Sequence, residues 1–120
     1  MHANELILYV ADQARAKAFY ADVLGLVPTL DVPGMTEFDL GGTTLGLMPV
    51  AGIVALVPGL RAGEGQRCEL YLRRADAARL LDRVGPAGGQ VLAAMADRSW
   101  GERVGYALDP DGHVLALAEA

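Results

Sequence analysis

Two glutamates, Glu5 and Glu69, stand at equivalent positions of a repeated segment, and they are the residues of this chain best suited to chemistry. The segments 5–15 (ELILYVADQAR) and 69–79 (ELYLRRADAAR) share Glu, Leu, Leu, Ala, Asp, Ala and Arg at a constant offset. Two carboxylates can bind a cationic amine, ligate a divalent metal, or act as a general base when burial or a neighbouring charge raises a pKa. The repeat therefore predicts a duplicated module with one carboxylate in each half.

The elements that must position these carboxylates follow one order in both halves: strand, helix, strand, strand, strand. In the first half an alternating strand precedes Asp12, a suitable helix N-cap, and Gly25 ends the helix. Asp76 and the pair Gly88-Gly89 take these places in the second half. The predicted strands are 5–10, 27–31, 36–40 and 43–48, then 68–73, 90–94, 103–108 and 113–118.

Alternation assigns the two faces of each strand. In the first strand, leucine and valine lie on one face, and Glu5 shares the other face with Ile7 and Tyr9. In the segment 69–73, leucines oppose Glu69, Tyr71 and Arg73. Because the leucine faces suit a helix, the mixed faces should line a ligand cavity. The last strand of each half, 43–48 and 113–118, also has two faces. We expect Leu45, Leu47, Leu115 and Leu117 to face the helices, and Thr44, Gly46, Met48, Val114, Ala116 and Ala118 to face the cavity.

Composition narrows the class of protein. The 120 residues, 52% of them hydrophobic, fit one domain with a real core. A net charge of −5 argues against nucleic acid and suits a neutral or cationic small molecule. Neither a signal peptide nor a membrane span is visible, so we expect a cytoplasmic protein with no membrane partner. Cys68, the single cysteine, excludes an intramolecular disulfide and is interpreted as a small buried hydrophobe.

Several motifs together resemble a known superfamily. They are 9–12 (YVAD), 19–26 (FYADVLGL), Gly88-Gly89, Trp100-Gly101 and 109–113 (DPDGH). Over essentially the whole chain they resemble the vicinal oxygen chelate superfamily of glyoxalases, bleomycin-resistance proteins and extradiol dioxygenases. The resemblance implies an α+β fold of two tandem βαβββ modules, residues 1–48 and 68–120, which form a cupped mixed sheet with helices on its outer face. The cups would complete a cavity within one chain or across a homodimer.

The linker 49–67 carries apolar residues from Ile53 to Leu60 that should pack on the body of the protein or on a second subunit. We therefore expect a homodimer.

The resemblance also identifies where a metal would be bound. Metal-dependent members present a His or Glu at the start of the first strand of each module and a Glu in the last strand. Glu5 and Glu69 match the first position, whereas Gly46 and Ala116 occupy the second and carry no ligand atom. Neither His2 nor His113 falls at a ligand position. This pattern predicts no tight transition-metal site and leaves room only for a weak Mg²⁺ or Mn²⁺ site completed by water.

We expect a metal-independent small-molecule-binding protein of the glyoxalase/bleomycin-resistance type. The two glutamates suit a cationic ligand. This ligand would contact Glu5, Ile7, Tyr9, Met48, Glu69, Tyr71 and Trp100, with Trp100 as a lid or cavity edge. The alternative is a lyase, isomerase or dioxygenase-like enzyme that uses Glu5 or Glu69 as a base or as a weak metal ligand. A simpler interpretation also stays open, in which the glutamates are solvated and the tyrosines fill the core. The sequence does not decide whether the chain is an enzyme.

Overall fold

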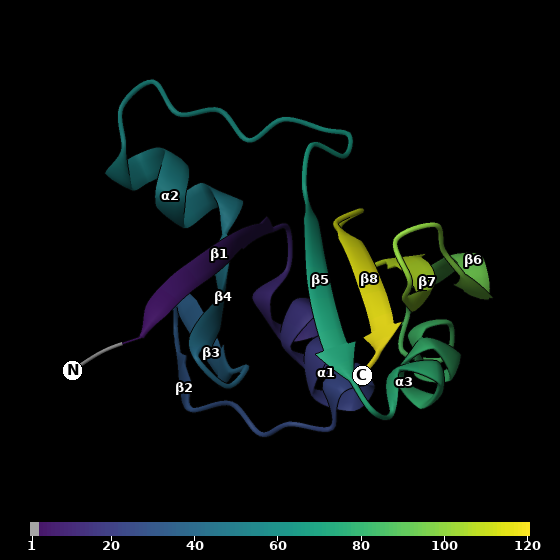
Figure 1. The fold of residues 1–120 in the computed structure, drawn as a ribbon. Coiled ribbons are helices and arrows are strands. Elements are labelled where there is room, and N and C mark those ends of the chain that lie inside the picture. Colours follow the sequence, from purple (N-terminus) through teal and green to yellow (C-terminus); the bar gives the residue numbers. More distant parts are fainter. Residues whose placement is uncertain (1–2) are drawn as a thin grey trace.

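The computed structural model describes residues 3–120, whose elements repeat one order twice (Figure 1). This confirms the predicted α+β class and the two tandem βαβββ modules. The first module comprises β1 (Asn4–Val10), α1 (Gln13–Leu24), β2 (Leu30–Val32), β3 (Met35–Asp39) and β4 (Thr43–Pro49). The second comprises β5 (Glu69–Arg74), α3 (Ala77–Val84), β6 (Gln90–Asp97), β7 (Arg103–Leu108) and β8 (Val114–Glu119), and α2 (Val50–Leu56) lies between the modules.

Hydrogen bonding divides the strands into two four-stranded sheets, which we name sheet A (β1-β4-β3-β2) and sheet B (β5-β8-β7-β6). In each sheet the first strand pairs in parallel with the last, and the other pairs are antiparallel. The register places Ile7 opposite Gly46 and Tyr71 opposite Ala116. The described strands thus form two sheets rather than one continuous sheet, with β1 and β5 each at an edge.

The helices α1 and α3 show that capping residues predicted from the sequence are correct in the first module but not in the second. Asp12 caps α1 as predicted, because its carboxylate accepts the N–H of Arg15 at 3.0 Å, and Gly25 ends the helix with φ 66°. The carboxylate of Asp76 instead accepts two hydrogen bonds from Arg74, so it makes no cap to α3. The helix also ends at Val84, before the predicted stop at Gly88-Gly89, and hydrogen-bonded turns fill the interval.

The linker contains one element that sequence patterns did not predict. The helix α2 begins directly after β4, and none of its side chains is buried. Cys68 is exposed rather than buried, because β5 begins only at Glu69 and the segment before it runs over the surface. Within residues 3–120, no helix is long and apolar enough to cross a membrane.

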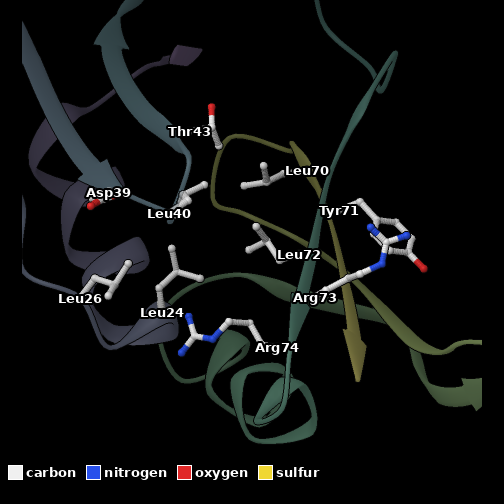
Figure 2. A pocket seen from close by; sticks show the side chains of 10 residues that line it. All are labelled: Leu24, Leu26, Asp39, Leu40, Thr43, Leu70, Tyr71, Leu72, Arg73 and Arg74. Carbon is white, nitrogen blue, oxygen red and sulfur yellow. The ribbon is translucent and has the colours of Figure 1, made fainter. Parts of the chain in front are cut away.

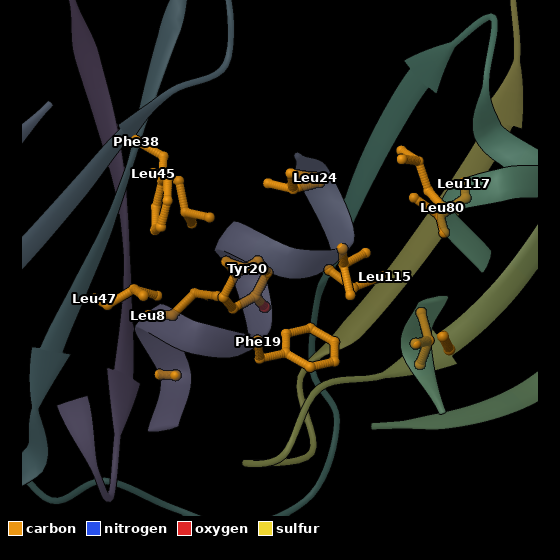
Figure 3. Packing of buried hydrophobic residues seen from close by; sticks show 14 of the residues in the cluster. Leu8, Phe19, Tyr20, Leu24, Phe38, Leu45, Leu47, Leu80, Leu115 and Leu117 are labelled. Carbon is orange, nitrogen blue, oxygen red and sulfur yellow. The ribbon is translucent and has the colours of Figure 1, made fainter. Parts of the chain in front are cut away.

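One hydrophobic core lies between the two sheets (Figure 3). Figure 3 shows α1 between the leucines of sheet A and those of sheet B, and α1 also contacts α3. As predicted, the closing strands contribute Leu45, Leu47, Leu115 and Leu117 to this core. A second, smaller cluster, made of Val104, Ala116 and Ala118 with Tyr71 and Tyr106 against it, occupies the opposite face of sheet B.

The shared core determines where the candidate faces point. Because α1 and α3 pack in one core between the sheets, the sheet faces opposite that core are turned away from each other. The short helix α2 contacts β1 and β4 and lies beside Met48 at the margin of sheet A. Exposure agrees with this arrangement, since Ile7 on sheet A is 40% exposed and Trp100 beside sheet B is 53% exposed. The molecule therefore presents two separate outer faces.

Candidate ligand-binding faces

The outer face of sheet A carries a pair of carboxylates. Glu5 lies on β1 and Glu37 on β3, with Gly46 of β4 between their strands. A Cβ at Gly46 would collide with the Glu5 carboxylate and would also touch Ile7 and Met35. We call this surface, made of Glu5, Ile7, Met35, Glu37 and Met48, the acidic face. The glycine is therefore the reason that the Glu5 side chain can lie over the centre of the sheet.

The electrostatics of Glu5 depend on Glu37. The pKa of Glu5 is raised above its ordinary value, first because the carboxyl loses contact with water and then because of a hydrogen bond and the charge of Glu37. The carboxylate beside Glu5 is thus Glu37 of β3, and not Glu69, the equivalent residue of the second module. Alternation from the buried Phe38 could have placed Glu37 on this face, because neighbouring residues of a strand point to opposite sides.

The outer face of sheet B carries a connected group of aromatic and charged side chains. The Tyr71 hydroxyl accepts a hydrogen bond from Trp100 Nε1 at 3.0 Å and donates one to Glu102 Oε1 at 2.8 Å. Arg73 donates to both carboxylate oxygens of Glu102, at 2.8 and 3.1 Å. We call the surface made of Tyr71, Arg73, Trp100, Glu102 and Tyr106 the aromatic face.

Charges on the aromatic face are paired with each other. Hydrogen bonds from Arg73 and then Tyr71 hold the pKa of Glu102 below its ordinary value, although loss of water contact opposes them. Loss of water contact raises the pKa of Tyr71, and the hydrogen bond and charge of Glu102 raise it further. The hydrogen bond from Trp100 and the charge of Arg73 act in the opposite direction. Arg73, which shares a strand face with Glu69, pairs with Glu102 instead. Sequence reasoning missed Glu102 because no strand alternation covers the loop that carries it.

The other predicted site residues lie near these faces. Glu69 is exposed at the start of β5, and Met48 is half-buried in β4. Ile7 and Tyr9 line a pocket of about 610 Å³ beside the segment 62–66 and the 111–113 turn. The structure thus groups Glu5, Ile7 and Met48 on sheet A and Tyr71 with Trp100 beside sheet B.

A second pocket, of about 380 Å³, lies where the two modules meet (Figure 2). In Figure 2, Leu70 and Leu72 point from β5 toward Leu40 and the end of α1, whereas Tyr71 and Arg73 point the other way. The picture therefore displays the predicted alternation of β5 directly. Leucines line this groove between the modules together with polar and charged residues, namely Asp39, Thr43, Tyr71, Arg73 and Arg74.

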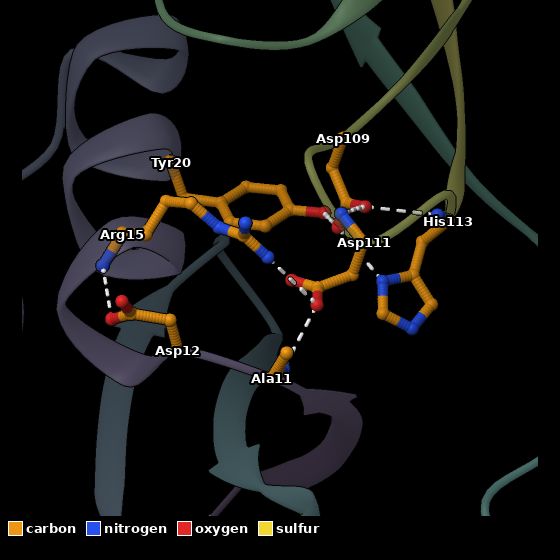
Figure 4. Close-up of polar contacts among 7 residues, drawn as sticks. All are labelled: Ala11, Asp12, Arg15, Tyr20, Asp109, Asp111 and His113. Atoms are coloured by element: carbon orange, nitrogen blue, oxygen red, sulfur yellow. Dashed lines mark hydrogen bonds and ion pairs between the residues drawn. The ribbon is translucent and has the colours of Figure 1, made fainter.

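The 109–113 turn joins the second module to α1 (Figure 4). The buried Asp109 accepts hydrogen bonds from the Tyr20 hydroxyl at 2.7 Å and from His113 Nδ1 at 2.8 Å. Asp111 accepts from the Ala11 N–H at 2.8 Å and from Arg15 at 3.2 Å. These contacts explain His113 as a structural residue of the turn.

Within residues 3–120 of one chain, the positions expected to ligate a metal do not form a complete transition-metal ligand set. Gly46 and Ala116 supply no ligand atom, and Ala116 is fully buried. Glu5 and Glu69 lie on different sheets. Over residues 3–120, no three His, Cys, Asp or Glu side chains gather in a way that could hold a metal ion. His2 lies outside the described residues.

The fold and its two faces define a duplicated βαβββ protein, and comparison with known proteins identifies its family. The model of the Glyoxalase/Bleomycin resistance protein/Dioxygenase superfamily matches residues 2–117. The chain therefore belongs to this superfamily, the vicinal oxygen chelate group.

Individual relatives show how far this similarity extends. The protein CFP32 of Mycobacterium bovis, whose name carries a provisional glyoxylase assignment, is 31% identical over 98% of this chain. The match covers 45% of that protein, so the chain spans about half of its length. A glyoxalase-related enzyme from Fulvimarina pelagi has a TM-score of 0.87 and 24% identity, over 99% of this chain and 88% of that one. Lactoylglutathione lyase from Agrobacterium tumefaciens has a TM-score of 0.71 and 28% identity, over 99% and 93%.

Proposed function

We propose that this chain binds a small organic molecule between the acidic face of one copy and the aromatic face of a second copy. The observation that supports this most is the outward direction of both faces from one shared core. A cavity lined by both modules then needs a second copy. Two copies related by a twofold axis would exchange faces and close two equivalent cavities.

Exposed apolar side chains support an assembly of this kind. On and just after α2, Val54 is 44% exposed, Leu56 69% and Val57 40%. Ile7 adds to the apolar surface on sheet A. Such a surface is stabilised when a second copy covers it. The homodimer that we expect from the sequence is accordingly part of the proposal.

The two faces have complementary chemistry for one ligand. Carboxylates attract a cationic group, and aromatic rings pack on an apolar body. The function that we propose needs no tightly bound metal, because Gly46 and Ala116 replace the side chains that would complete a ligand set. We place this binding activity in the cytoplasm.

One observation favours a second candidate function. A carboxylate with a raised pKa can act as a general base, and the Glu5 pKa is raised by desolvation and by Glu37. In an isomerase or lyase of this kind, Glu5 would remove a proton next to a carbonyl group of the substrate. Glu5→Gln would then abolish turnover and spare binding, whereas in a pure binder it would weaken a cationic ligand.

Sedimentation equilibrium and calorimetry test the main proposal. We expect twice the chain mass of 12.6 kDa at micromolar concentration, and one N,N-dimethyldecahydroquinolinium ion, an apolar cation, bound per chain. Glu5→Lys should weaken binding of this ion, and Asp22→Lys, which makes the same charge change at an exposed position of α1, should not. A monomer at all micromolar concentrations would contradict the proposal.

A further inference from the structure

We infer that Trp100 is a fixed platform for a flat aromatic ring of the ligand, and that Tyr71, Glu102 and Arg73 hold it in position. The inference rests on the proposed function, since Trp100 belongs to the aromatic face. It goes further by naming the ligand class and by assigning positioning roles to Glu102 and Arg73.

A chain of hydrogen bonds fixes the indole at one edge. The indole N–H lies in the plane of the ring, so its 3.0 Å bond to the Tyr71 hydroxyl holds that edge and leaves the ring faces free. The same hydroxyl donates to Glu102 at 2.8 Å, which fixes its direction. Two hydrogen bonds from Arg73 then hold the Glu102 carboxylate.

The loop that carries Trp100 is also fixed by hydrogen bonds. The Arg98 N–H donates to the Glu102 carbonyl at 2.8 Å, and the Gly101 N–H donates to the Arg98 carbonyl at 3.0 Å. Gly101 has a φ of 91°, which a residue with a side chain rarely adopts. The Arg98 side chain in turn bonds the Val104 carbonyl of β7. The backbone on both sides of Trp100 is therefore tied to the sheet.

The three rings of the aromatic face differ in what covers them. The Arg73 guanidinium lies 4.8 Å from the centre of the Tyr71 ring, and the Arg98 guanidinium lies 5.2 Å from that of Tyr106. Within residues 3–120, no aromatic ring or cation stacks on Trp100, which is 53% exposed. Trp100 is thus the ring that offers a free face to a ligand.

Stacking, rather than ion pairing, is the interaction that this part of the face can provide. Glu102, the carboxylate in contact with Tyr71, is already paired with Arg73. A flat ring gains from stacking on indole, and a positive charge on that ring adds attraction to the indole face. A flat aromatic cation therefore suits the site better than a saturated cation of the same skeleton.

Trp100 is the only tryptophan of the chain, so its fluorescence reports on the site directly. The probes are N-methylquinolinium, which is flat, and N,N-dimethyldecahydroquinolinium, its saturated counterpart of equal charge. On the wild-type chain the flat probe should bind roughly threefold to tenfold more tightly than the saturated one. Trp100→Leu should bring this ratio to about one.

The positioning role is tested by removing one hydroxyl. Tyr71→Phe should lower the fluorescence anisotropy of Trp100 and reduce the preference for the flat probe over the saturated one. Ser99→Ala, which removes a hydroxyl from an exposed side chain next to Trp100 and outside the aromatic face, should change neither quantity. Equal binding of both probes, or unchanged anisotropy and preference in Tyr71→Phe, would overturn the inference and leave the proposed function standing. Failure of both probes to bind would contradict the proposed function itself.

Discussion

At the scale of single residues, Gly46 and Glu37 decide the character of the acidic face. A side chain at Gly46 would meet the Glu5 carboxylate, Ile7 Cγ1 at 3.1 Å and Met35 Sδ at 3.3 Å. The missing Cβ therefore lets Glu5 lie over the sheet near Glu37. Strand alternation was sufficient to predict the face of Glu5 and Ile7. It did not reveal the contact between Glu5 and Glu37, which depends on how β1, β4 and β3 are ordered in the sheet.

Glu5→Gln should remove a pH dependence from the stability of the protein. A folded pKa above the unfolded one favours the folded state at low pH, and this contribution is lost as pH rises above about 4.3 through the folded value. Near neutral pH the substitution should therefore be neutral or stabilising, by at most about 0.5 kcal/mol because the side chain is exposed. Urea unfolding at several pH values measures this. Glu64→Gln, in the exposed linker, is the control, and a loss of stability in Glu5→Gln at neutral pH would contradict the prediction.

Purified protein should contain well below one equivalent of Zn, Ni, Fe or Mn, because Gly46 and Ala116 supply no ligand atoms. Elemental analysis measures the metal content directly. A chelator should leave the thermal midpoint unchanged, since no folding free energy depends on metal. A stoichiometric metal would instead favour the enzyme over the binder.

At the scale of elements, the 109–113 turn does more than connect β7 to β8. Proline and glycine chemistry was enough to predict the turn itself. Its contacts with Tyr20, Ala11 and Arg15 join residues that are 89 to 100 positions apart in the sequence, so no local pattern could reveal them. The Asp76 prediction failed for a local reason: Asp76 takes the N-cap position of α3, but Arg74, two residues earlier, holds its carboxylate away from the helix N–H groups.

The His113–Asp109 contact predicts a loss of stability at alkaline pH. The hydrogen bond to Asp109 raises the pKa of His113; burial opposes this, and the charges of Asp109 and Asp111 add to it. The contribution is fully present below about pH 6.5 and disappears as pH rises through the folded value. His113→Gln should therefore cost about 1 kcal/mol at pH 6 and less at pH 8.

Unfolding in urea at both pH values checks this prediction, with His2→Gln as the control for the other histidine. Asp109 titrates in a separate, acidic range, because hydrogen bonds from His113 and Tyr20 outweigh its burial and keep its pKa low. An equal loss of stability at pH 6 and pH 8 would show that His113 contributes only packing.

At the scale of the whole molecule, the packing of the helices determines what one chain can and cannot bind. The repeat and the leucine faces were sufficient to predict two βαβββ modules and the residues that face the helices. They did not show that α1 lies between the two sheets, because that arrangement depends on how the modules pack together. This packing turns the acidic and aromatic faces outward and makes the second copy necessary for the proposed cavity.

Mixing two defective chains tests the shared cavity most directly. Glu5→Lys damages the acidic face, and Trp100→Leu damages the aromatic face. In a mixed dimer with shared cavities, one cavity carries both substitutions and the other is fully wild type. Calorimetry with N-methylquinolinium should then show one site of wild-type affinity per mixed dimer, although neither variant alone has one. Absence of any wild-type site in the mixed dimer would contradict a cavity formed between copies.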